Sequence, residues 1–189
     1  MPDSAAGLLA RLDAANRDQV AAEVRKLETI HELCLAYHAV DEDAFGEAAE
    51  KLIYHGAGGT PAVAEYLSLE VAALLGMSPG AAAALIGDVL NCAYRHPIMW
   101  QAVRAGAVRW YRATAVISEV NRAGLSYDDA QHVDARITPQ LCALPRGRAL
   151  RLLRGLIAAA APERARAREQ LARDRRHLTL WSPTLDDGA

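Results

Sequence analysis

Hydrophobic side chains recur every three to four residues at the start of the chain, which predicts one long amphipathic helix over residues 5–40. Ser4 stands where an N-cap is expected. An acidic linker follows, and then a short helix is expected over residues 44–54. The segment GAGGTP predicts a break in regular structure at 58–61. The apolar stripe of the long helix consists of Leu8, Leu12, Val20, Val24, Leu27, Ile30, Cys34 and Tyr37.

The second half of the chain shows the same helical spacing in shorter stretches. One helix is predicted from Pro97 to Arg104, and AGAV interrupts it before the next helix, over about 110–122. Gly124 is expected to end that helix in a left-handed conformation. Ser126 then has the position of an N-cap for a helix over about 127–143.

The C-terminal part predicts two more helices and one strand. Pro139 lies inside the helix over 127–143 and predicts a kink or a restart there. Helices follow over 147–160 and 162–174. Polar and apolar residues then alternate over 177–182, which predicts a strand, and TLDDGA is typical of a turn. We therefore expect a truncated hairpin over residues 177–189.

The segment SLEVAALLGMSPGAAAALIG, residues 68–87, has the spacing of a helix-turn-helix, a motif that we place at 68–90. The small Ala72 lets two helices approach, Gly76 permits a left-handed turn, and Pro79 suits the first turn of the second helix. Apolar residues stand at the remaining positions that the motif requires, namely Val71, Leu75, Met77, Ala82 and Leu85.

The second helix of this motif lacks the chemistry for reading DNA. Base recognition in the major groove needs side chains that donate and accept hydrogen bonds. PGAAAALIGDVL offers only Asp88, whose carboxylate repels phosphate. The sequence therefore favours a structural role for the helix-turn-helix.

Composition supports a helical fold. Hydrophobic residues make up 52% of the 189 residues, much of this alanine, and aromatic residues only 5%. Alanine favours helices, so we predict an all-α, multi-helix domain. Its expected parts are a long N-terminal helix, a central helix-turn-helix and a short C-terminal β strand.

The sequence indicates a protein of the cytoplasm. The first residues have neither a basic region nor a long apolar run, so we expect no signal peptide. No stretch approaches the length of a membrane span. The three cysteines, Cys34, Cys92 and Cys142, lie far apart, which favours buried thiols in a reducing compartment over a disulfide or a zinc site.

The net charge of −2 conceals an uneven distribution. Residues 1–70 carry 5 basic and 13 acidic side chains, whereas residues 146–176 carry 10 arginines and 3 acidic residues, a net charge of +7. Such a segment is suited to bind phosphates without sequence preference. Alternatively, its arginines pair with the acidic first helix or are only solvated. The arginines are Arg146, Arg148, Arg151, Arg154, Arg164, Arg166, Arg168, Arg173, Arg175 and Arg176.

We find no convincing catalytic or metal-binding set. His31 and His38 lie near Glu28 and Glu32 on the first helix, an arrangement more typical of a solvated helix face than of a metal site. His132 stands among aspartates and is also expected at the surface. No phosphate-binding loop or nucleophile motif occurs. The sequence therefore predicts no catalytic residue, cofactor, metal or small-molecule substrate.

Three segments, in this order, resemble the actinobacterial 13E12 repeat family, also called domain of unknown function 222. They are EVAALLGMSPGAAAALIGDVL, AVRAGAVRWYRATAVISEV and RGRALRLLRGLIAAAAPERARAREQLARDRRHLTLWSPTLDDG. Many members of this family continue into an HNH endonuclease module. The resemblance implies that this chain matches the N-terminal half of such a protein. The family's second helix after the SP turn is often arginine-rich, and here it is not.

The resemblance and the charge pattern give one main expectation and two alternatives. We expect a non-catalytic region that associates with double-stranded DNA through its basic C-terminal helices, or that regulates a nuclease module. Alternatively, the chain is a helical scaffold that forms a homodimer through its first helix, or it is a gene remnant without function. The expected regions are residues 1–57 (long helix and acidic linker), 58–176 (helical core) and 177–189.

Overall fold

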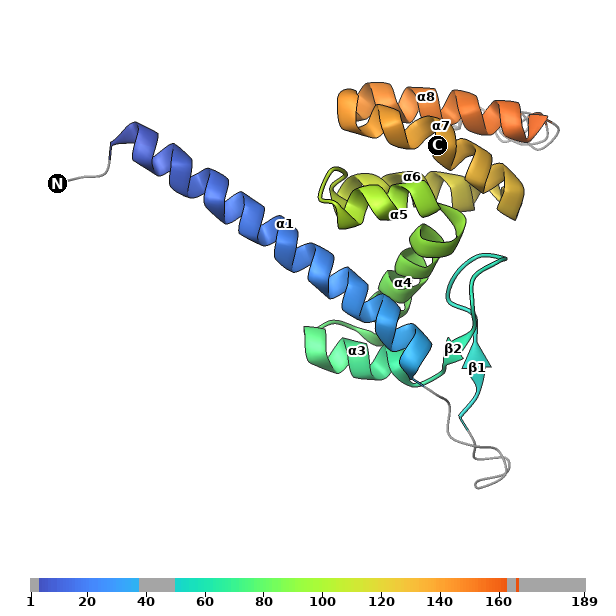
Figure 1. The fold of residues 1–189 in the computed structure, drawn as a ribbon. Coiled ribbons are helices and arrows are strands. Elements are labelled where there is room, and N and C mark those ends of the chain that lie inside the picture. Colours follow the sequence, from blue (N-terminus) through green and yellow to red (C-terminus); the bar gives the residue numbers. More distant parts are fainter. Residues whose placement is uncertain (1–3, 38–49, 163–165, 167–189) are drawn as a thin grey trace, which may run out of the picture.

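The computed structural model describes residues 4–37, 50–162 and 166. These residues form seven α-helices, one π-helical turn and one two-stranded antiparallel sheet, so the chain has the all-α fold that its composition predicts (Figure 1). The elements are α1 (Ala5–Ala36), β1 (Leu52–Ile53), β2 (Val63–Ala64), α3 (Leu67–Leu75), α4 (Pro79–Leu90), η2 (the π-helical turn, Asn91–Arg95), α5 (Pro97–Arg104), α6 (Trp110–Ala123), α7 (Tyr127–Ala143) and α8 (Arg146–Ala160).

The helices are stacked, and α1 crosses the stack on one side. In Figure 1, α3 and the β1–β2 hairpin lie at one end, α5 and α6 in the middle, and the antiparallel pair α7 and α8 at the other end. The C-terminal half of α1 packs against α4, α5 and β2. Its first turns project away from the other helices, and every residue from Ala5 to Ala15 is exposed or half-buried.

Local signals determine most of the helix ends. The Ser4 hydroxyl accepts a hydrogen bond from the Gly7 N–H at 3.2 Å, which confirms it as the N-cap of α1. The Ser126 hydroxyl caps α7 in the same way. Gly124 ends α6 with φ 63°, as predicted. The helix α5 begins at Pro97 and ends at Arg104, also as predicted, and α7 continues through Pro139 without a break.

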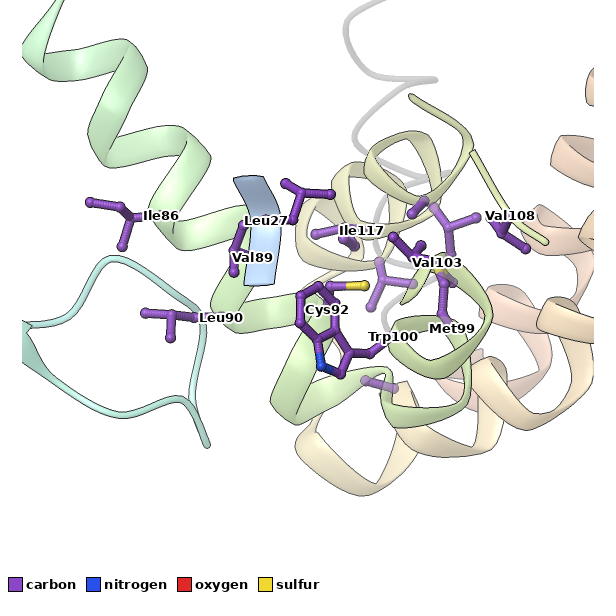
Figure 2. Packing of buried hydrophobic residues seen from close by; sticks show 14 of the residues in the cluster. Leu27, Ile86, Val89, Leu90, Cys92, Met99, Trp100, Val103, Val108 and Ile117 are labelled. Atoms are coloured by element: carbon purple, nitrogen blue, oxygen red, sulfur yellow. The ribbon is translucent and has the colours of Figure 1, made fainter. Parts of the chain in front are cut away.

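One hydrophobic core joins all the helices. Figure 2 shows Leu27 of α1 close to Val89 of α4, with Trp100 and Met99 of α5 beside Cys92. Each of these side chains contributes about 1.5–3 kcal/mol of transfer free energy when it is fully buried. Trp100 is buried, and Trp110 packs against the same core.

Two expectations need correction here. The predicted helix over 44–54 is wrong at residues 50–54, where Leu52 and Ile53 form β1 and pair with Ala64 and Val63 of β2. Its other residues lie outside the described ranges. Cys142 is exposed rather than buried, because the last turn of α7 turns it away from the core.

Two further predictions fall beyond the described ranges. The predicted helix over 162–174 is described only at residues 162 and 166, which are both helical. The predicted strand over 177–182 and the hairpin turn after it lie outside the described residues.

A buried arginine ties the hairpin to the helical stack. Arg95, at the end of η2, is only 2% exposed. Its guanidinium donates hydrogen bonds to the carbonyl of Gly58, in the turn between β1 and β2, and to the carbonyl of Leu125 at 2.8 Å. Because a π-helical turn shifts the helical register, η2 directs this side chain into the gap between the two loops.

Candidate nucleic-acid interface

The helix-turn-helix that the sequence predicts has the expected geometry. The axes of α3 and of α4 with η2 turn by 107°, within the range of about 90–120° that is usual for this motif. Gly76 adopts a left-handed conformation with φ 63°, and the Ser78 hydroxyl caps α4 through the Ala81 N–H. Pro79 is the first residue of α4, as predicted.

The predicted positions of this motif differ in burial. Val71, Ala72 and Ala82 are buried, and Met77 and Leu85 are half-buried against the core. Leu75 is 38% exposed, which corrects the expectation that it faces inward. It lies in the last turn of the short helix α3, where it is not covered. The remaining predicted positions, Gly76 and Pro79, are exposed.

The second helix of the motif offers nothing that reads a base. The solvent-facing residues of α4 are Pro79, Gly80, Ala81 and Ala84, none of which carries a hydrogen-bonding side chain. Asp88 is half-buried, and desolvation raises its pKa. The helix α4 also packs against α1. These observations support a structural role for the helix-turn-helix in building the core.

The arginines of α8 lie opposite its buried face. Ala149 and Leu153 are buried against α6 and α7, whereas Arg148, Arg151 and Arg154 recur at three-residue steps on the exposed side. Residues at this spacing are neighbours on a helix surface. The structure therefore presents three guanidinium groups as one row along α8.

Intramolecular ion pairs leave most of this charge uncompensated. Arg154 lies 3.9 Å from the carboxylate of Glu119 on α6, an exposed contact that is worth little. The guanidinium groups of Arg146, Arg148 and Arg151 have no hydrogen-bond or ion-pair partner within the described residues. The alternative that arginines of this segment pair with α1 finds no support among the described residues of α8.

The rest of the predicted basic segment is described at one position only. Arg166 is helical and exposed. The other five arginines lie outside the described residues, namely Arg164, Arg168, Arg173, Arg175 and Arg176.

Arg112 lies outside the basic segment that the sequence predicts, and it extends this basic surface onto α6. The Arg112 guanidinium donates a hydrogen bond to the Leu144 carbonyl at 2.6 Å, just before α8 begins. Arg112 and Arg146 line the same small surface depression between α6 and α8. The signal was present as RWYR in the sequence, but only the packing of α6 against α8 relates it to the basic segment.

Of the two histidines that the sequence raised as possible metal ligands, His31 makes other contacts and His38 lies outside the described residues. The His31 ring is half-buried, with its centroid 5.7 Å from that of Tyr94 and 5.6 Å from that of Trp100. Desolvation lowers its pKa. His132 is exposed, with Nδ1 3.0 Å from the Asp128 carbonyl oxygen. Within the described ranges no group of three His, Cys, Asp or Glu side chains is placed to hold a metal ion.

Comparison with protein-family models, curated proteins and solved structures finds no match to this chain. The resemblance to the 13E12 family therefore rests only on the three sequence segments quoted for it above. In the described part of the chain, no single helix is both long enough and apolar enough to cross a membrane.

Proposed function

We propose that this chain is a non-catalytic helical module, of the kind found in the N-terminal half of 13E12-type HNH endonuclease-like proteins, that holds double-stranded DNA near a nuclease module. The observation that carries the proposal is the uncompensated row of arginines on α8. Guanidinium groups bind phosphate oxygens through two parallel hydrogen bonds, and a row of them follows a phosphate backbone without reading bases.

Two further observations support contacts to the backbone over base recognition. The exposed surface of α4 carries no side chain that can read a base, although α3 and α4 form a helix-turn-helix. Arg112 and Arg146 extend the basic surface from α8 toward α6. We further propose a cytoplasmic location, which the free thiols of Cys34 and Cys92 support.

Fluorescence anisotropy of a labelled random-sequence DNA duplex, titrated across a salt series, tests this proposal. The R148A/R151A variant removes two exposed charges that have no partner among the described residues. Its expected slope of log affinity against log salt is shallower by about 2, because each phosphate contact releases about one counterion. K26A/K51A is the matched control, since it removes two exposed charges from other surfaces and should leave the slope unchanged.

Two results would contradict the proposal. Absence of duplex binding even at low salt would leave the α8 arginines without a nucleic-acid role. Cleavage of plasmid DNA by the purified chain with Mg²⁺ or Mn²⁺ would contradict the non-catalytic part, if it survives repurification and responds to mutation of the chain.

A second candidate function is a helical scaffold that forms a homodimer through α1. It is favoured by Leu8, Leu9 and Leu12, which are 52%, 67% and 67% exposed on the part of α1 that projects from the core. Light scattering discriminates the two functions. A stable dimer that L9E/L12E dissociates, together with no affinity for DNA, would support the scaffold.

A further inference from the structure

A groove separates α1 from the corner between α5 and α6. Its volume is about 750 Å³, a size typical of ligand sites. Val20, Ala21 and Val24 of α1 form one apolar side of it, and Ala105 and Gly106 of the corner lie opposite. Neither the helix-turn-helix nor the α8 arginine row contributes to this groove, so it is separate from the proposed DNA surface.

Three contacts fix the width of the groove. The Arg109 guanidinium donates to Asn16 Oδ1 at 2.9 Å, and Arg104 Nε donates to Glu28 Oε1 at 2.6 Å. Between them, Gly106 adopts φ 68°, and a Cβ atom there would lie 3.2 Å from Val20 Cγ1. Because glycine is the residue that suits both this conformation and this close approach, the corner holds α1 at a fixed distance.

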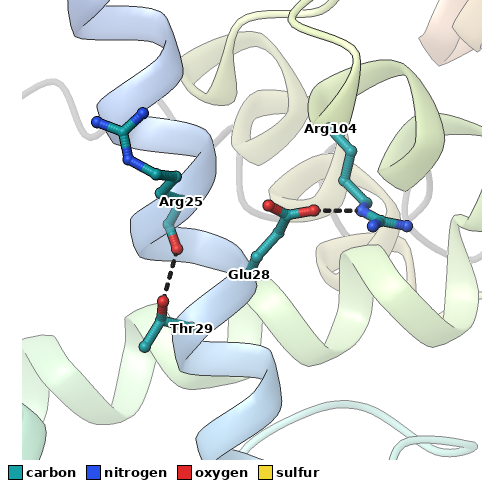
Figure 3. A network of polar contacts seen from close by, with 4 residues as sticks. All are labelled: Arg25, Glu28, Thr29 and Arg104. Carbon is teal, nitrogen blue, oxygen red and sulfur yellow. Dashed lines mark hydrogen bonds and ion pairs between the residues drawn. The ribbon is translucent and has the colours of Figure 1, made fainter.

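Among the described residues, every charged side chain that lines the groove is an arginine. They are Arg17 and Arg25 on α1, and Arg104 and Arg109 at the corner. Arg17 pairs with Asp13 at 3.3 Å, but both side chains are largely exposed, so this contact is weak. The Arg25 guanidinium has no partner within the described residues, and its backbone carbonyl accepts from Thr29 inside α1 (Figure 3).

The two corner arginines have guanidinium N–H groups that are unpaired within the described residues. Figure 3 shows that Arg104 presents Nε to Glu28 while its other two nitrogens point away from that carboxylate. Arg109 Nε is buried without a hydrogen-bond partner. Arg109 is also the N-cap of α6, whose first turn has neither a capping side chain nor an acidic residue. The positive end of the α6 dipole therefore adds to the charge of the corner.

The composition of the groove selects among anionic ligands. A phosphate backbone would pair with the arginines, but it would leave the apolar side formed by Val20, Ala21 and Val24 without apolar partners. A base would stack on aromatic rings, and none of the described residues that line the groove is aromatic. An amphipathic helix with carboxylates beside its apolar face satisfies both parts, since apolar anchors fill a groove and carboxylates pair with arginine.

We propose that the groove between α1 and the α5–α6 corner binds an acidic amphipathic helix of a partner protein. Leucine-type side chains of that helix contact Val20, Ala21 and Val24, and its Asp or Glu carboxylates pair with Arg25, Arg104 and Arg109. The proposal does not depend on DNA binding by α8, because the two surfaces share no residue.

The test uses a fluorescein-labelled synthetic helix of about 14 residues, long enough at 1.5 Å per residue to span the groove. Leucines occupy one face, with glutamates on both sides, and two matched peptides carry glutamine or lysine instead of glutamate. The full chain should bind the glutamate peptide about tenfold or more tightly than the glutamine peptide, and the lysine peptide least.

Two matched variants locate the binding. Ala21 is exposed and lines the groove, whereas the adjacent Ala22 is exposed and does not, so both accept a large side chain without disturbing the core. A21W should weaken binding of the glutamate peptide about tenfold or more, and A22W should leave it unchanged. R25E should weaken it as well, while R148A/R151A on α8 should not.

The other outcomes overturn the proposal. If the glutamate peptide does not bind, or binds A21W as well as the native chain, the groove is not its site. If A21W weakens binding of the DNA duplex and duplex displaces the peptide, the groove belongs to a nucleic-acid surface. If the native chain is a dimer by light scattering that A21W dissociates, a second copy occupies the groove.

Discussion

The carboxylate of Asp134 in α7 accepts the backbone N–H of Ile98 at the start of α5, at 2.8 Å. It also accepts the N–H of Met99 at 3.2 Å and the hydroxyl of Thr138 at 2.6 Å. His96, the N-cap residue of α5, makes no side-chain capping bond. Asp134 therefore caps α5 from another helix, and it is completely buried in doing so.

Replacement of Asp134 should destabilise the fold strongly. D134A leaves two buried N–H groups and the Thr138 hydroxyl without their acceptor, which we expect to lower the free energy of unfolding by about 2–4 kcal/mol. D134N keeps one acceptor oxygen and should lose less. Urea denaturation measures both variants. D128A on the exposed first turn of α7 is the control, and an effect of D134A no larger than that of D128A would contradict the capping role.

His96 should make the protein less stable in mild acid. It is completely buried, neither ring nitrogen has a partner in the structure, and burial lowers its pKa from 6.5 to about 4. Below pH 6.5 the unfolded chain therefore takes up a proton more readily than the folded chain. Stability should fall between pH 6.5 and about 4, by on the order of 3 kcal/mol in total.

The variant H96L isolates this effect. It should remove that part of the pH dependence in urea titrations at pH 7, 6, 5 and 4.5, and it should be at least as stable as the native chain at low pH. H132L changes an exposed histidine and serves as the control. Parallel stability curves for H96L and the native chain would refute the assignment.

Two glycines of α4 should respond to alanine with opposite signs. A Cβ atom at Gly87 would lie 2.5 Å from the His55 carbonyl oxygen, so G87A forces the hairpin away from α4. We expect a loss of about 2 kcal/mol or more. Gly80 has open space around its Cα, and G80A should gain up to about 1 kcal/mol from helix propensity. Thermal denaturation compares the pair, and equal shifts would contradict this packing.

The three thiols should differ in reactivity. Cys142 is exposed, whereas Cys34 and Cys92 are buried. Burial raises the pKa of Cys34 to about 11 and raises that of Cys92 further. A thiol reagent such as 5,5′-dithiobis(2-nitrobenzoate) should modify one cysteine per folded chain rapidly and the other two only in urea, since the thiolate is the reacting form. Rapid modification of C142S would contradict this order.

The candidate site was predictable only where the signal is local in sequence. The density of arginines between residues 146 and 176 predicted a basic surface, and Arg148, Arg151 and Arg154 are exposed together as the helical spacing indicates. Arg104 and Arg109 stand outside this dense segment, and only the packing of α1 against the α5–α6 corner brings them to one groove. Their relation to Asn16 and Glu28 spans most of a hundred residues of chain.

The sequence by itself determined most of the helices and several of their ends, although α1 ends at Ala36 and not at residue 40 as predicted. Ser4, Ser126, Pro97 and Gly124 act on backbone conformation or on hydrogen bonds within one turn, so their effect does not depend on the rest of the molecule. The left-handed turn at Gly76 belongs to the same group. Such signals can be recognised in a short stretch of sequence, because the hydrogen bonds and backbone conformations involved span only a few residues.

Only the tertiary structure decided which faces remain exposed and which polar groups meet. Leu52 and Ile53 form a strand because Val63 and Ala64 pair with them, against a local pattern that favoured helix. Asp134 became the cap of α5, and the α5–α6 corner became one wall of an arginine-lined groove, through packing between helices distant in sequence. These relationships depend on the three-dimensional placement of whole elements, which burial of the shared core sets.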